Sequence, residues 1–88
     1  MQKYALYILY SQSLDIYYKG ISHDPELRLQ YHNSSSKGWT KRGRPWKLVF
    51  NKAFDSKKEA QFWEIKIKKI KKRAIVETII NGQFDWTK

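Results

Sequence analysis

The first part of the chain alternates apolar segments with short polar breaks in a pattern typical of a β-hairpin. Residues 4–11 (YALYILYS) are continuously apolar and aromatic, as in a strand buried on both faces. A short polar connection (QSLD) follows, and β-favouring residues resume at 16–22 (IYYKGIS). These two segments therefore predict two adjacent strands.

A helix is predicted directly after the second strand. Asp24 suits the N-cap, Pro25 the first helical position, and Glu26 the positive end of the helix dipole. We expect this helix to run to about His32, because Asn33 and the SSSKG that follows are typical of a helix end.

The middle of the chain predicts a loop and then a third strand. Residues 33–45 are rich in serine, glycine and basic residues, and a loop of this length in a small domain is either functional or a solvated connector. Residues 46–54 (WKLVFNKAF) predict the strand, with Trp46, Leu48 and Phe50 alternating on one side.

The second half of the chain is helical in its pattern. SKKE at 56–59 forms a capping box, and apolar residues then recur at helical spacing: Ala60, Trp63, Ile67 and Ile70. Residues 73–81 give a second helical stretch, whose pattern fits both a separate helix and a continuation of the first. In the tail QFDWTK, we expect Phe84 or Trp86 to pack onto the body of the protein.

These elements predict an α+β fold in the order β-β-α-β-α-α, with a small three-stranded antiparallel sheet flanked by helices. With 88 residues, we expect one domain over residues 1–88. The chain is 41% hydrophobic and 16% aromatic, which argues against disorder and predicts a core rich in aromatic rings.

The charge of the chain narrows the classes of partner. Eighteen Lys and Arg against eight Asp and Glu give a net charge of +10, which favours a nucleic acid. The alternatives are a protein that binds an anionic membrane surface and a basic protein that binds no polyanion.

Without cysteine, the chain can form neither disulfides nor thiolate metal sites, so any metal would take oxygen or histidine ligands, as Mg²⁺ and Mn²⁺ do. The first apolar run is too short to span a membrane and lacks a cleavage site, so we expect a cytoplasmic protein.

Three groups of residues are candidates for chemistry, each with a plainer alternative. Arg28 and His32 share a helix face and suit phosphate binding and proton transfer, although a solvated face is equally common. Glu64 borders the apolar face of its helix, where it would be a metal ligand or an ion-pair partner of Lys68. Tyrosines in adjacent strands, in contrast, more often pack than catalyse.

Taken together, these residues resemble the GIY-YIG nuclease superfamily, specifically its small single-domain bacterial members. The first motif corresponds to Ala5-Leu6-Tyr7 and the second to Tyr18-Lys19-Gly20, with ten residues between the two tyrosines. Arg28 and His32 match the arginine helix of the family. PWKLVF resembles its third strand, and KKEAQFWEIKIKK resembles the helix whose glutamate binds metal, which falls on Glu64. The resemblance extends over about residues 4–81.

The motifs depart from the family pattern at positions that are largely structural. Ala5 and Leu6 replace the glycine and isoleucine of the first motif, and Lys19 replaces the isoleucine of the second. Some members carry a lysine just after the second motif, where this chain has Ile21. Lys19 would point to the opposite face from Tyr18 in a regular strand and need not substitute for that lysine. Many members also use a late asparagine, for which Asn81 is the candidate.

The resemblance implies metal-dependent hydrolysis of DNA phosphodiesters, directed by backbone or DNA shape and serving DNA repair or recombination; RNA is the other possible substrate. Glu64 would hold Mg²⁺ or Mn²⁺ together with water ligands, and Arg28 would neutralise charge on the phosphoryl oxygens. Tyr7 would take the proton of the attacking water if neighbouring cations lower its pKa, and His32 is the other candidate base. Tyr18 would hydrogen-bond the water or the phosphate.

Basic residues outside this group are expected to bind backbone phosphates. They are Lys37, Lys41, Arg42 and Arg44 in the loop and Lys68 and Lys69 on the long helix. Trp39 in the same loop would stack on a base or fold back on the body, whereas Tyr17 and Tyr31 are expected to pack. Two other classes fit the composition: a nucleic-acid-binding module without catalysis, and an interaction domain that uses the helix from residue 56.

Overall fold

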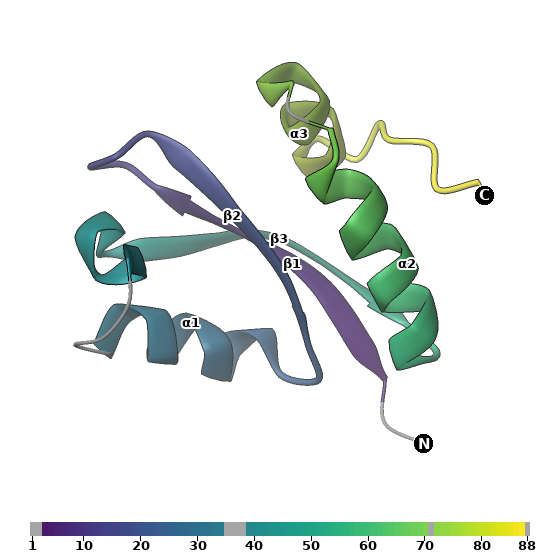
Figure 1. Cartoon of the computed structure of the whole chain (residues 1–88), viewed down its shortest axis with the longest axis horizontal. Coiled ribbons are helices and arrows are strands. Elements are labelled where there is room, and N and C mark those ends of the chain that lie inside the picture. The colour runs from purple at the N-terminus through teal and green to yellow at the C-terminus, as the bar shows by residue number, and fades with distance from the viewer. Residues whose placement is uncertain (1–2, 35–38, 71, 88) are drawn as a thin grey trace.

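The computed structural model describes residues 3–34, 39–70 and 72–87 and has the predicted order of elements (Figure 1). In chain order, these are β1 (Tyr4–Ser11), β2 (Ile16–Ser22), α1 (Pro25–Ser34), the 3₁₀ helix η1 (Trp39–Gly43), β3 (Trp46–Phe54), α2 (Lys57–Lys68) and α3 (Arg73–Ile80). The strands form one antiparallel sheet in the order β2-β1-β3. The predicted α+β class is therefore confirmed. None of the helices in the described ranges is long and apolar enough to cross a membrane.

The sheet lies between two helical layers, with α1 on one face and α2 with α3 on the other (Figure 1). Because β1 is the central strand, its successive side chains enter two different cores. Leu6 and Ile8 pack with the helices α2 and α3, whereas Tyr7 and Leu9 pack on the α1 side. The expectation of a strand buried on both faces is confirmed.

A β-bulge in β3 changes which side chains share a face. The register of β1 and β3 shifts between Ile8 and Leu9, so that Leu9 pairs with Leu48 while Ile8 pairs with Phe50. Trp46 and Leu48 therefore belong to the core on the α1 side, and Phe50 packs in the core beneath α2 and α3. The prediction that Phe50 shares a side with Trp46 and Leu48 was wrong, because the extra residue reverses the alternation of side chains.

The helix α1 begins as predicted and ends later than predicted. The Oδ1 atom of Asp24 accepts a hydrogen bond of 3.1 Å from the amide of Leu27, which confirms Asp24 as the N-cap. The helix continues to Ser34, because Asn33 does not break it but donates through its Nδ2 atom to the carbonyl of Trp46, at 3.0 Å. Within the predicted loop, residues 39–43 form η1.

The long helix begins as predicted but ends at Lys68, so Ile70 lies beyond it, and the tail packs as expected. The Ser56 hydroxyl accepts a hydrogen bond from the amide of Glu59 at 3.2 Å, as a capping box requires. The helices α2 and α3 are separate, which decides between the two alternatives. Both aromatic residues of the tail pack on the body, since the rings of Trp86 and Phe84 lie 5.2 Å and 6.1 Å from the ring of Trp63.

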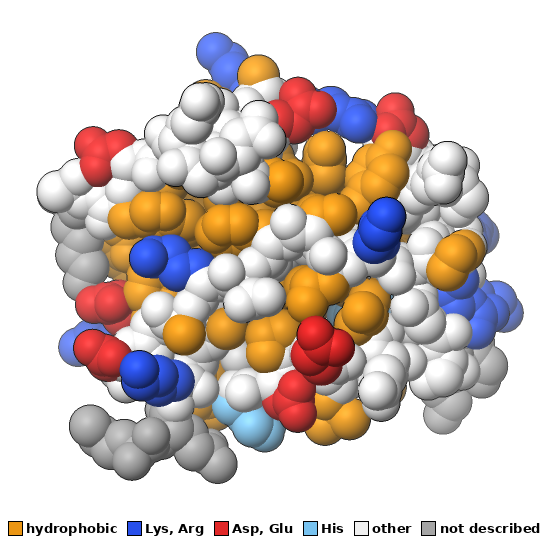
Figure 2. Space-filling view, turned by 180° about the vertical axis from the view of Figure 1, so that it is seen from behind, with side chains coloured by type: hydrophobic (Ala, Val, Ile, Leu, Met, Phe, Trp, Pro, Cys, Tyr) orange, Lys and Arg blue, Asp and Glu red, His pale blue; other side chains and the backbone are white. Residues whose placement is uncertain are grey.

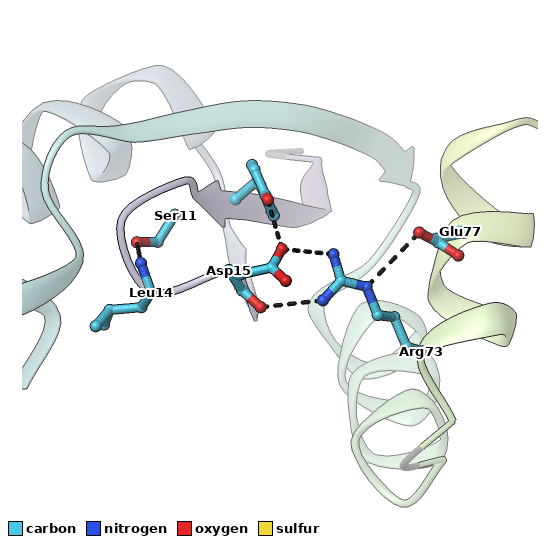
Figure 3. Close-up of polar contacts among 6 residues, drawn as sticks. Ser11, Leu14, Asp15, Arg73 and Glu77 are labelled. Atoms are coloured by element: carbon cyan, nitrogen blue, oxygen red, sulfur yellow. Dashed lines mark hydrogen bonds and ion pairs between the residues drawn. The ribbon is translucent and has the colours of Figure 1, made fainter.

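The turn between β1 and β2 is anchored to α3 across the sequence (Figure 3). Asp15 has a left-handed backbone conformation with φ of 54°, which aspartate tolerates better than most residues. The Arg73 guanidinium donates to the Asp15 carboxylate at 2.7 Å and to its backbone carbonyl at 3.0 Å, and lies 3.6 Å from Glu77. The hairpin and the start of α3 are therefore held together by a forked contact.

Candidate active site

The side chain of Tyr7, on the central strand β1, extends over the edge strand β2. Tyr7 is 1% exposed and pairs directly with Gly20 of β2. A Cβ atom built on Gly20 would lie 2.7 Å from the Tyr7 hydroxyl oxygen and 2.8 Å from Cζ. The phenol ring therefore lies over the glycine backbone, and its hydroxyl group reaches toward the β2 edge of the sheet. Any side chain at position 20 would occupy this path.

Replacing Gly20 by alanine should displace the Tyr7 hydroxyl without destroying the fold. The new methyl group would overlap the end of a buried ring, and overpacking of this kind typically costs about 1–3 kcal/mol. We expect a lower melting temperature together with a displaced Tyr7 ring. Calorimetry would measure the first effect and the NMR shifts of the Tyr7 ring the second, and an alanine variant that changes neither would contradict the close approach.

Arg28 connects α1 to this hydroxyl group. The Arg28 guanidinium donates a hydrogen bond to the Tyr7 hydroxyl and stacks on the ring of Tyr31, with Cζ 4.7 Å from the ring centroid. This hydrogen bond, together with the nearby tyrosine hydroxyls, raises the pKa of Arg28 even though burial opposes the shift. The residue is therefore a permanent cation fixed beside the sheet edge.

Tyr18 and His32 complete the group on the α1 side of the sheet. The Tyr18 ring stacks 6.3 Å from that of Tyr7 and lies 4.7 Å from the His32 ring. His32 is 3% exposed, and among the described residues neither of its ring nitrogens has a hydrogen-bond partner. Burial lowers the pKa of His32, and the positive charge of Arg28 lowers it further. The imidazole is therefore neutral near neutral pH, and the Arg28–His32 face is not a solvated one.

Glu64 belongs to α2, in the layer on the other face of the sheet. Burial is the main cause that raises the pKa of Tyr7, and the Glu64 carboxylate adds a smaller electrostatic contribution, so the two groups lie within electrostatic range. The Glu64 side chain is 19% exposed and forms an ion pair of 3.2 Å with Lys68. Both alternatives for Glu64 thus remain open: it has its lysine partner, and it also lies within electrostatic range of the phenol.

The protonation of Tyr7 differs from the one expected for a general base. Burial raises the pKa of Tyr7, and the hydrogen bond from Arg28 only partly opposes this shift. Arg28 lowers the pKa of Tyr7 as expected, but its effect is smaller than that of burial, so the net shift is upward. The phenol is therefore protonated near neutral pH.

Two residues named as weaker candidates lie on the other face of the sheet. Lys19 pairs with Ile8 and so points away from Tyr18, as predicted; burial and the charge of Lys68 lower the pKa of Lys19. Asn81 is the C-cap of α3 and lines a hollow of about 260 Å³ with Tyr17 and others. The contacts of Asn81 in the described residues do not connect it to Tyr7 or Arg28.

The predicted phosphate-binding residues differ in how far they are engaged. Lys41, Arg42 and Lys69 are exposed, whereas Lys68 is paired with Glu64. Arg44 donates to two backbone carbonyls, those of Lys41 at 3.2 Å and Asn33 at 3.3 Å, and so holds η1 against α1. Lys37 and the side chain of Trp39 lie outside the described residues.

The side of the molecule turned away from the viewer of Figure 1 is not a basic surface. Figure 2 shows a broad band of hydrophobic side chains across the middle of that side, with lysine and arginine scattered around the band and acidic residues among them. A polyanion would therefore find no concentrated positive charge there.

Among the described residues, Glu64 is the carboxylate that the candidate site offers to a divalent cation. Within the described ranges, no three His, Cys, Asp or Glu residues gather into a group that could hold a metal ion. Mg²⁺ accepts such an environment, because it keeps several water ligands and is often bound through one or two carboxylates and a phosphate. The partly exposed carboxylate of Glu64, within electrostatic range of the Tyr7 phenol, fits this requirement.

Two residues near the site were not identified from the sequence. Asn33 was interpreted as a helix end, yet its side chain ties α1 to the first residue of β3 through hydrogen bonds to the backbone of Trp46. Tyr31 was expected to pack, yet it is 50% exposed beside Arg28. Its position one turn after Leu27, on the outer side of the helix, was the available signal.

Comparison with known proteins identifies the family of this chain. The family model described as the GIY-YIG catalytic domain matches residues 3–77. The chain is also similar to the solution NMR structure of a UPF0213 protein from Bacillus halodurans, with 32% identity, a TM-score of 0.59, and coverage of 92% of this chain and 85% of that one. No curated protein matches the chain significantly.

Proposed function

Because the chain belongs to the GIY-YIG family of nuclease domains, we propose that it is an endonuclease that hydrolyses DNA phosphodiester bonds with Mg²⁺ or Mn²⁺. The observation that carries this proposal is the contact between the Arg28 guanidinium and the Tyr7 hydroxyl at the sheet edge, within electrostatic range of Glu64. A cation, a phenol and a carboxylate from three different elements thereby support one proposed catalytic group.

Each residue in this group has a role that suits its environment. Arg28 binds the scissile phosphate and neutralises the charge that develops on its oxygens, an effect typically worth about 10²–10³ in rate for one preorganised donor. The protonated Tyr7 hydroxyl, which accepts a hydrogen bond from Arg28, would donate a hydrogen bond of its own to a phosphate oxygen and keep its proton. The Tyr18 ring stacks beside that of Tyr7, and its hydroxyl would hydrogen-bond the water or the phosphate.

Glu64 would hold the metal ion, which supplies Lewis-acid stabilisation of the phosphate when bound. Lys68 must then leave the carboxylate, and half of its side chain is already exposed to solvent. The neutral His32 packs against Tyr18, and both of its ring nitrogens are buried without a hydrogen-bond partner among the described residues. A neutral imidazole can accept a proton, which a protonated phenol cannot, so His32 is the alternative base.

DNA contacts outside the centre would come from the exposed Lys41, Arg42 and Lys69 and from the loop that contains Lys37 and Trp39. Contacts of this kind neutralise backbone phosphates and do not read a base sequence, so recognition would depend on DNA shape, as in a role in repair or recombination in the cytoplasm. RNA remains the alternative polymer.

One observation favours a second function. The Glu64–Lys68 ion pair neutralises the carboxylate that the described residues contribute to the site, as would suit a module that binds nucleic acid without cutting it. This alternative predicts salt-sensitive binding that does not require a metal ion, and no cleavage.

The decisive experiment incubates the protein with supercoiled and branched DNA, and with RNA, in the presence and absence of Mg²⁺ or Mn²⁺. The proposal predicts metal-dependent nicking of DNA. Binding without cleavage under all of these conditions would instead support the second function, and cleavage of RNA alone would change the substrate.

A further inference from the structure

The outer side of α1 carries two exposed apolar side chains beside the candidate site. Leu27 is 55% exposed and Tyr31, one turn later, is 50% exposed. Neither belongs to the two hydrophobic cores. An exposed aromatic ring next to a proposed phosphate-binding arginine is a feature that the roles assigned above leave unexplained.

Two neighbours hold the Tyr31 ring in place. The Arg28 guanidinium lies over it, with Cζ 4.7 Å from the ring centroid, and the His32 ring meets it edge-on at 5.6 Å with an interplanar angle of 76°. The same guanidinium hydrogen-bonds the Tyr7 hydroxyl. The aromatic surface of Tyr31 is therefore separated from the reacting phosphate by one side chain only.

We propose that Tyr31 stacks on a nucleobase adjacent to the phosphate that Arg28 binds. This inference rests on the proposed nuclease function and specifies its substrate: a strand with an unpaired or unstacked base beside the cleaved bond. In an intact duplex the faces of each base are covered by its neighbours, so a protein ring can stack only where the strand is single or distorted. Base stacking of this kind tolerates any sequence, because every base has an aromatic face.

The charge around the ring suits this occupant better than a protein partner. The exposed side of Tyr31 adjoins a fixed guanidinium in a chain of net charge +10, and a nucleotide presents a flat ring and an anion side by side. Leu27 would add apolar contact to the sugar or the base edge.

A purely structural role, in which Tyr31 only orients Arg28, predicts a different dependence on the substrate. The test therefore compares two fluorescent oligonucleotides of equal length, one of normal single-stranded DNA and one made only of abasic residues. Binding is measured by anisotropy without metal, so that cleavage is not needed. Tyr31→Ala should weaken binding of the normal strand about tenfold and leave binding of the abasic strand unchanged, whereas Tyr31→Phe should bind both strands as the parent does.

The chain offers a matched control in Phe62, which is 42% exposed and carries Lys66 over its ring at 5.7 Å, on α2. Phe62→Ala should leave the binding of both strands unchanged. An equal loss for the normal and abasic strands in Tyr31→Ala would overturn the stacking role. If the base-dependent loss is found while no variant or parent cuts DNA, the stacking site stands and the nuclease proposal fails.

Discussion

Replacing Glu64 by glutamine is expected to abolish metal-dependent cleavage. The amide keeps the size of the side chain but removes the single carboxylate that the described part of the site offers a divalent cation. Lewis-acid stabilisation is worth several kcal/mol, and each loss of about 1.4 kcal/mol is a factor of ten, so we expect a decrease of at least about a thousandfold in rate. Calorimetric titration with Mn²⁺ should show a parallel loss of binding that does not depend on any nuclease assay.

Lys68→Gln is the matched control for this prediction. It removes the ion-pair partner at 3.2 Å and keeps the carboxylate free for the metal ion. Because Lys68 is half exposed, the pair is worth at most about 1 kcal/mol, and Mn²⁺ should bind about two- to fivefold more tightly than in the parent. If Glu64→Gln retains Mn²⁺ binding and cleavage, the metal site lies elsewhere.

The extent to which the sequence predicts the fold depends on how local each signal is. Apolar runs and helix caps involve neighbouring residues, so the bounds of β1, β2, β3 and the cap at Asp24 agree with the pattern. The bulge in β3 could not be predicted in this way. It depends on the pairing of Leu9 with Leu48 and of Ile8 with Phe50, and such a register is set by packing between strands far apart in the sequence.

For the candidate site as well, the sequence predicts the residues better than it predicts their environment. The resemblance to the family identified Tyr7, Arg28 and Glu64 as candidate residues, and in the structure Arg28 hydrogen-bonds Tyr7 while the charge of Glu64 has a small effect on the Tyr7 pKa. Their protonation could not be predicted, because the pKa of Tyr7 depends on a balance between burial and the Arg28 hydrogen bond. The exposure of Tyr31 was missed because an aromatic residue in a helix is more often part of the core.

Arg28→Ala should reduce cleavage by about a hundredfold or more while leaving the protein folded. The guanidinium is the only group for which the structure shows contacts to both the Tyr7 hydroxyl and the Tyr31 ring within the described residues, so its loss removes the preorganised charge beside the phosphate. Arg28→Lys should recover little of the rate, because an ammonium group lacks the fork that contacts Tyr7 and a phosphate at the same time. The loss should appear in kcat at saturating DNA, as expected for a group that acts mainly in the transition state.

The pKa of His32 tests the position of Arg28 without an activity assay, and it distinguishes the loss of Arg28 from the loss of any other positive charge. Arg28 lowers the pKa of His32 in addition to the larger effect of burial, so Arg28→Ala should raise this pKa toward its ordinary value without reaching it. Nuclear magnetic resonance titration of the imidazole would measure the change. Lys3→Ala, which removes one exposed positive charge at the start of β1, is the control and should alter neither kcat nor the His32 titration. If the two variants titrate alike, Arg28 does not face His32, and the assembly of the site on α1 is wrong.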